Sequence, residues 1–300
     1  MDVIIQGALE QGLVYCFMVL GVFITFRVLD FPDLTVDGSL PLGAAVTAAL
    51  IVNGHSPLVA TAVGVGAGIC AGTVTGFLHV LLKSGESEST NYGPKLLAGI
   101  LTMTALYTVN LRIMGRSNTP LLGVEVIFDK LGAIFSVSMI GWNLILAVAA
   151  LAIVVKYFLD WLLHTEFGLT LQATGDNEQM IRALGTNTNF TRIVGLALAN
   201  GLVALSGSLV AQQQGFADVG MGIGTIVAGL AGVIMGEVLF GVRSISWVLF
   251  SVIGGSIVYR LLIAISLRLG IAPTDLKLLT AVLVVVALSV PTVRKKVVRQ

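Results

Sequence analysis

The feature that most constrains this chain is a succession of apolar segments, each close to the length of a membrane-spanning helix. Crossing the hydrocarbon of a bilayer takes about 20 apolar residues. About nine segments meet or approach that length, and they are Ala8–Phe26, Ser39–Val52, Leu58–Leu82, Leu96–Leu111, Ile140–Phe158, Ile193–Gln212, Ile223–Phe240, Ser246–Ile265 and Leu276–Val290. The pattern predicts an all-α polytopic membrane protein with roughly 8–10 transmembrane helices.

The composition agrees with lipid as the outer solvent. Hydrophobic residues make up 56% of the chain and charged residues 11%, which is less than half of the roughly 25% typical of a soluble domain. The net charge of +1 provides no basic surface for nucleic acid. The three histidines, His55, His79 and His164, are scattered, and the chain has neither an HExxH nor a GxSxG motif. These observations disfavour a nucleic-acid-binding protein and an intramembrane enzyme.

Polar residues between the first two apolar segments indicate a broken or half helix near residues 30–52. Pro32 ends any helix before it, and Ser39 can cap the helix that follows. A discontinuous helix exposes backbone groups beside carboxylates, as in many transporter binding sites. The candidate pathway residues here are Asp33, Thr35, Asp37, Gly38 and Ser39. The alternative is an ordinary interfacial loop whose aspartates are hydrated.

Two other places add candidates for the same pathway. Asp218 precedes a glycine-rich break before an apolar segment, and Thr102 and Thr104 form a polar row on the fourth segment. The simpler interpretation of the threonines is hydrogen bonding between helices. The polar run Lys83–Lys95 is assigned no function.

The stretch Lys156–Arg192 is the longest polar interruption between two apolar segments. Within it, Gly175 is expected to break the chain, and Asp176 or Asn177 to cap a new helix. Glu178 in the first turn suits the helix dipole, and a glycine at position 185 ends the helix. The pattern predicts a short helix that lies outside the bilayer between two spans.

Residues Thr165–Gly185, together with the small-residue helix Thr191–Leu209, resemble the permeases of ATP-binding-cassette (ABC) importers of the branched-chain amino acid and ribose type. The shared pattern is FG…LxAxGxNxxxAxxxG, with mild departures at Thr174 and at Met180 and its neighbour. The resemblance covers most of the chain. It is closest to a subset associated with tryptophan or tyrosine uptake, through Asp33–Ser39 and Leu97–Thr104.

The resemblance implies that residues 165–187 contain a cytoplasmic coupling helix that docks on a separate ATPase. Carried over residue by residue, the coupling positions are Glu166, Gly168, Gly175, Asp176, Asn177, Glu178, Arg182 and Gly185. The chain has no GxxxxGK[ST] sequence, so it is not expected to be the ATPase itself. No catalytic residue, metal site or cofactor is expected on this chain, and ATP and Mg²⁺ would bind the partner.

The resemblance further implies a single permease domain over residues 1–300 that imports a small solute by alternating access. The solute would be an amino acid or a related compound, with aromatic ones among the candidates. The implied partners are ABC ATPase subunits, an extracytoplasmic solute-binding protein, and a second copy of the chain or a similar permease. The alternative is a secondary transporter or channel driven by an ion gradient, which would work without an ATPase.

The basic tail indicates the orientation in the membrane. Arg294, Lys295, Lys296 and Arg299 place the C-terminus in the cytoplasm, as expected for a bacterial inner-membrane protein. The short second segment and the stretch Leu121–Ser138 leave the side of the N-terminus open, because either could be a half-helix.

Overall fold

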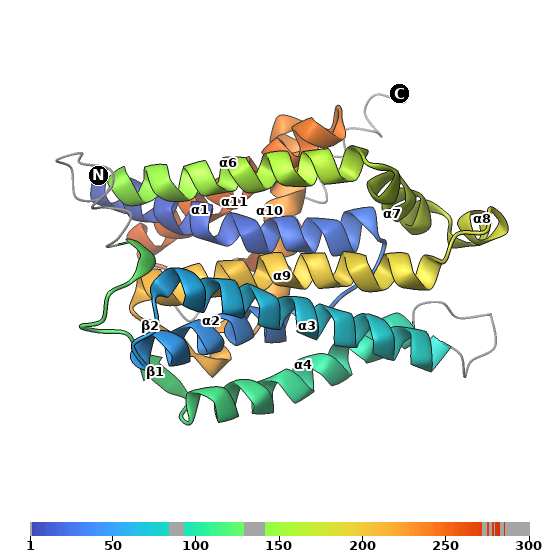
Figure 1. The fold of residues 1–300 in the computed structure, drawn as a ribbon. Coiled ribbons are helices and arrows are strands. Elements are labelled where there is room, and N and C mark those ends of the chain that lie inside the picture. Colours follow the sequence, from blue (N-terminus) through green and yellow to red (C-terminus); the bar gives the residue numbers. More distant parts are fainter. Residues whose placement is uncertain are drawn as a thin grey trace.

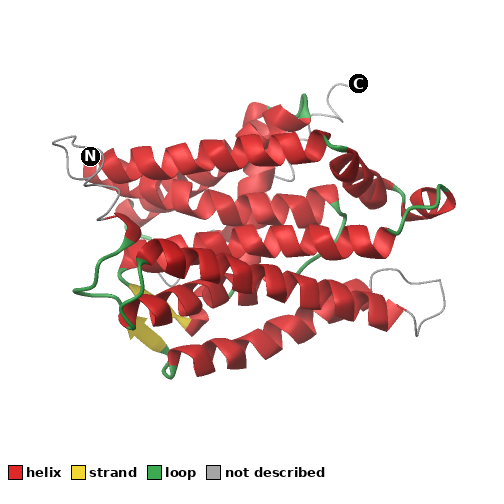
Figure 2. Ribbon diagram, in the orientation of Figure 1, coloured by secondary structure: helices red, strands yellow, loops and turns green. Residues whose placement is uncertain are grey.

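The computed structural model describes residues 2–83, 93–128 and 142–271, with a few further positions up to residue 285. This part of the chain is almost entirely helical (Figures 1 and 2). Seven of its helices are long and apolar enough to cross a membrane, and an eighth apolar helix is shorter. The predicted all-α polytopic fold is therefore confirmed. The predicted segment Leu276–Val290 lies largely outside the described residues, as do residues 84–92, most of 121–138 and the basic tail.

The bundle consists of long helices, most of which run roughly side by side, whereas α10 crosses behind them at a steep angle (Figure 1). They are α1 (Asp2–Phe23) with the π-helical turn η1 (Ile24–Val28), α2 (Val36–Val52), α3 (Pro57–Lys83), α4 (Gly93–Met114), α6 (Trp142–His164), α9 (Thr188–Gln214), α10 (Thr225–Phe240) and α11 (Ile245–Arg268). Two short helices, α7 (Glu166–Asp176) and α8 (Glu178–Ala183), project from one end of the bundle (Figure 1). We call this the α7–α8 end.

The opposite end carries a small antiparallel sheet and the start of α1 (Figure 1). Strands β1 (Asn118–Pro120) and β2 (Phe216–Asp218) pair with Thr119 opposite Ala217, and the 3₁₀ turn η2 (Val219–Gly222) follows. The sheet ties the chain after α4 to the chain after α9. We call this the β1–β2 end.

The predicted break in the second segment is present. The chain leaves the α-helical conformation in η1, passes through residues 29–35, and becomes helical again at Val36. Asp30 has a φ of 48°, in the left-handed region that non-glycine residues rarely occupy. The 17 residues of α2 fall short of the length needed to cross the hydrocarbon. The start of α2 lies inside the bundle rather than at its surface, because Asp33, Thr35 and Val36 are fully buried.

Helix α9 lies at the centre of the bundle, in contact with α1, α2 and α3 (Figure 1). Close approach requires small residues, because lipid provides no hydrophobic drive for helix association. At Gly72 of α3, an added Cβ would overlap the carbonyl group of Leu196 in α9. At Gly66 of the same helix, nothing lies within 4 Å of that position. The α3–α9 contact therefore depends on one side of α3 having no side chains.

We expect Gly72→Ala to destabilise the protein by about 1–3 kcal/mol, because the new methyl group has no room. The matched variant Gly66→Ala should be neutral or slightly stabilising, since alanine is the better helix former. Thermal unfolding in detergent measures both. Equal midpoints for the two variants would contradict the close packing of α3 on α9.

Candidate functional site

A buried carboxylate and a buried amide meet at the centre of the bundle. Asp33, in the segment before α2, is fully buried, as is Asn200 near the middle of α9. Asn200 Nδ2 donates to Asp33 Oδ2 at 2.7 Å, and the backbone N–H of Thr35 donates to Asp33 Oδ1 at 2.9 Å. The carboxylate thus has a donor on each oxygen, but no cation beside it among the described residues.

Three hydroxyl groups extend this polar cluster to a third element. Ser39 Oγ, in the first turn of α2, donates to Asn200 Oδ1 at 2.7 Å. Both the oxygen and the nitrogen of the Asn200 amide therefore bond to residues at the break before α2. The hydroxyls of Thr35 and Thr75 are 2.9 Å apart, which links the segment to α3. The structure therefore brings Asp33, Thr35 and Ser39 together around Asn200. We call these residues and Thr75 the central cluster.

Asp37 lies apart from the central cluster and caps another helix. Its Oδ1 accepts from the N–H of Ile226 at 2.8 Å and from the hydroxyl of Thr225 at 3.0 Å, and its Oδ2 accepts from the N–H of Gly224 at 2.9 Å. A carboxylate at a helix N-terminus satisfies the free N–H groups and favours the helix dipole. Asp37 therefore fastens the start of α10 to α2.

The remaining pathway candidates are scattered. Gly38 packs closely against Leu106 of α4, and its carbonyl accepts from Asn110 Nδ2 at 3.2 Å. Thr102 is buried and bonds to its own helix, whereas the side chain of Thr104 is exposed on the outer face of α4.

Asp218 lies in β2, outside the central cluster. Its Oδ1 accepts from the N–H of Gly220 at 2.7 Å, which starts the turn η2.

The polar stretch folds as two short helices rather than one. Asn177 separates α7 from α8, and its side chain accepts from the N–H of Met180 at 3.0 Å, so Asn177 is the cap. Gly175 does not break the chain; it lies within α7, where a Cβ would overlap the carbonyl group of Val28. Gly185 has a φ of +85° and follows the end of α8, as expected of a terminating glycine.

The other residues of this stretch divide into buried and exposed sets. Gly168 packs closely on Leu163 of α6. Glu166, Asp176 and Arg182 are exposed.

Two apolar side chains are also exposed here, Met180 in α8 and Leu184 directly after it, with exposed fractions of 51% and 73%.

Glu178 holds α8 against the bundle through three cations. Its carboxylate lies 2.6 Å from Lys83 Nζ at the end of α3, 2.9 Å from the guanidinium of Arg182, and 2.8 Å from that of Arg192 in α9. Burial acts to raise the pKa of Glu178, but the hydrogen bond from Lys83 and the nearby positive charges outweigh it and lower that pKa to about 2. The carboxylate therefore stays ionised and joins α3, α8 and α9.

Comparison with known proteins identifies the family. Residues 4–288 match the model of the family described as the branched-chain amino acid transport system permease component. The chain belongs to this permease family. A tyrosine transport system permease protein of Clostridioides difficile is 43% identical over 285 residues, which cover 95% of this chain and 90% of that protein.

Two further relatives are more distant. An uncharacterized protein of Rickettsia prowazekii is 34% identical over 95% of this chain and 97% of its own length. The autoinducer 2 import system permease protein LsrC of Escherichia coli is 32% identical over 67% of this chain and 54% of its own length. No solved structure matches the permease.

These findings establish the general function. The chain is a transmembrane subunit of an ABC-type transport system and moves a small solute. They do not assign individual residues, so the coupling and pathway positions remain predictions.

The sequence interpretation missed several residues that hold the site together. Asn200, Thr75 and Arg192 were not singled out, although each is a polar residue within or beside an apolar segment. Polar residues at membrane depth face the protein interior, and that rule applied to every span would have found Asn200. Its pairing with Asp33, 167 positions away in the chain, could not be read from spacing.

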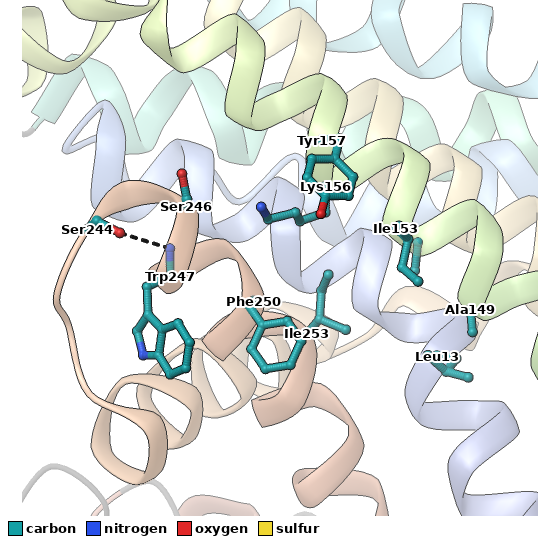
Figure 3. Close-up of a pocket in the computed structure, with 11 residues that line it drawn as sticks. Leu13, Ala149, Ile153, Lys156, Tyr157, Ser244, Ser246, Trp247, Phe250 and Ile253 are labelled. Atoms are coloured by element: carbon teal, nitrogen blue, oxygen red, sulfur yellow. Dashed lines mark hydrogen bonds between the residues drawn. The ribbon is translucent and has the colours of Figure 1, made fainter.

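The permease also has a cleft of about 550 Å³ between α6 and α11, lined mainly by apolar side chains such as Ile153 and Phe250 (Figure 3). Lys156 and Ser246 lie at its polar end, and both bond to Asp160. The cleft contains none of the predicted pathway residues.

We expect Asn200→Leu to destabilise the permease by about 2–3 kcal/mol, because it removes the amide donor from a buried carboxylate. Adding Asp33→Leu to that variant should recover part of the loss, since no unpaired charge remains. Thermal unfolding of the two single variants and the double variant in detergent tests this. Strictly additive effects would show that the two side chains do not interact.

Another prediction from this site concerns the pH dependence of the ion pairs that Glu178 makes with Lys83, Arg182 and Arg192. The pKa of Glu178 in the folded protein is about 2, below its ordinary 4.5. Its ionised form therefore stabilises the fold above about pH 4.5, and this contribution is lost as the pH falls toward about 2. The gap in unfolding midpoint between wild type and Glu178→Gln should shrink over that range. Glu166→Gln, an exposed carboxylate in α7, is the control, and a constant gap would contradict the assignment.

Proposed function

We propose that this permease is the membrane subunit of an importer powered by a separate ATPase, and that α7 and α8 form the surface on which the ATPase docks. The observation that carries the proposal is the projection of these helices beyond the bundle (Figure 1). The apolar side chains of Met180 and Leu184 are exposed there, outside the spans. An exposed apolar patch outside the lipid marks a protein interface.

Close packing would transmit motion of the docked helices. Gly168 packs on Leu163 of α6, and Gly175 on the backbone at Val28 and the residue after it. Glu178 adds ionic links to α3 and α9. In this proposal the residues of this region serve two purposes. Met180 and Leu184 contact the ATPase, whereas Gly168, Gly175 and Glu178 contact the bundle.

The distribution of basic residues supports a cytoplasmic location for the α7–α8 end. This end carries Arg27, Lys83, Lys95, Arg182, Arg192 and Arg243. The β1–β2 end, where α4 and α11 finish, carries Arg112, Arg116 and Arg268. Cytoplasmic ends of membrane proteins are rich in Lys and Arg. The N-terminus then lies on the extracytoplasmic side, where a solute-binding protein would deliver the cargo, and the membrane is the bacterial inner membrane.

The proposed cargo is an amino acid, with aromatic ones favoured because a relative at 43% identity is named a tyrosine transport system permease. The proposed path passes the central cluster, which is closed in this conformation because Asp33 and Asn200 are fully buried. Opening would separate Asp33 and Ser39 from Asn200. A second copy of the permease would complete the complex.

The test is co-purification from native membranes in mild detergent. Replacing the exposed apolar residues in the variant Met180→Glu/Leu184→Glu should release the ATPase, because carboxylates cannot enter an apolar interface without a partner. Leu122→Glu is the matched control, since Leu122 is 85% exposed but lies at the opposite end. Uptake into vesicles without ATP or any ATPase would instead establish the gradient-driven alternative.

A further inference from the structure

Arg260 places a positive charge inside the membrane-spanning part of α11. It lies about 12 Å from the end of the helix at a rise of about 1.5 Å per residue. Its guanidinium carbon is 3.6 Å from the ring centroid of Tyr15 in α1. Tyr15 is buried near the middle of the span Ile5–Val28. The guanidinium therefore sits well within the hydrocarbon depth of the bundle, away from either end of α1.

This charge has no anionic partner in the part of the chain that the structure describes. There, the ring of Tyr15 is the only group that Arg260 contacts through its charge. Three other basic side chains within or beside the spans have carboxylate partners: Arg27 pairs with Glu237, Lys156 with Asp160, and Arg192 with Glu178.

The contact with the Tyr15 ring is weak compensation. A cation–π contact contributes about 0.5–2 kcal/mol, whereas a charge at the bilayer centre costs about 2.5–3.5 kcal/mol or more. Charged residues at this depth are found where they face the bundle interior or a solute path.

We propose that Arg260 binds the carboxylate of the transported solute. The inference rests on the proposed amino acid cargo. A guanidinium offers a planar set of N–H donors that matches the two oxygens of a carboxylate. The ring of Tyr15 lies against the guanidinium, no hydrogen-bond acceptor contacts its N–H groups among the described residues, and the side chain is only half-buried.

The depth of Arg260 argues against a lipid as the anion. Lipid phosphates lie in the headgroup layer, outside the hydrocarbon, whereas Tyr15 is at mid-span. A carboxylate supplied by a second copy of the chain is the competing explanation, and the experiment below distinguishes it.

The experiment restores the charge chemically. Arg260→Cys is made with Cys70→Ala, because Cys70 is exposed whereas Cys16 is buried. The complex with its ATPase and binding protein is reconstituted in vesicles, and tyrosine uptake is measured. We expect uptake to fall by about tenfold or more, the loss that follows removal of a charge-assisted hydrogen bond. Aminoethyl methanethiosulfonate, which adds a cation at this position, should restore uptake, and the anionic sulfonatoethyl reagent should not.

Arg243→Cys is the matched control. Arg243 also lies over an aromatic ring, 5.6 Å from the centroid of Trp247, but it is exposed before the start of α11. Its replacement and modification should leave uptake unchanged. If the Arg260 variant does not fold, Arg260→Lys and Arg260→Gln replace it, and the lysine variant should retain more uptake than the glutamine variant.

Three results would overturn the proposal. These are wild-type uptake by Arg260→Cys, equal effects of the cationic and anionic reagents on this variant, and dissociation of its two permease copies in detergent. The last result would assign Arg260 to contact between copies. If the unmodified wild type shows no ATP-driven uptake, the proposed function fails, and that outcome is distinct from failure of the Arg260 assignment.

Discussion

The hydrogen bond between Asp33 and Asn200 holds a broken helix inside the bundle, and the arrangement of the other helices depends on this. Backbone N–H and C=O groups have no water to bond with in hydrocarbon, so a break must be satisfied by the protein. Residues 29–35 meet this need partly through their own turns, as the N–H of Phe31 donates to the carbonyl of Thr25 at 2.9 Å. The Asp33 carboxylate accepts from the N–H of Thr35, the ammonium of Lys95 donates to the carbonyl of Asp30, and Asn200 holds the Asp33 carboxylate in place.

The same helix that supplies Asn200 also links the two candidate regions. Helix α9 begins five residues after α8 ends, and Arg192 in its second turn bonds to Glu178. About two turns farther on, Asn200 reaches the broken segment. Since α9 is packed closely against α3 at the Gly72 contact, it acts as a rigid connection. Helix α9 is therefore part of both the group of ion pairs around Glu178 and the central cluster.

Charges in the spans show how the fold uses its few ionisable groups. Asp37 accepts from three donors at the start of α10, and Lys156 is paired with Asp160 one turn on in α6, where Ser246 of α11 also donates to Asp160. These groups have structural partners, which explains why a carboxylate or an ammonium at membrane depth is not in itself a solute site. In the described residues, Arg260 differs in having only an aromatic ring beside it.

The sequence alone determined the helical membrane fold, the break before α2, a helix cap at Asp176 or Asn177, and the terminating glycine Gly185, because hydropathy, proline and capping residues act locally. The structure decided that the cap is Asn177. The sequence did not determine that Gly175 is a packing contact, that Asp37 caps α10, or that Thr104 points outward. Those outcomes depend on which helices are neighbours and how each is rotated. Only the tertiary structure sets both, because contacts such as Asp33 with Asn200 join residues that lie far apart in the chain.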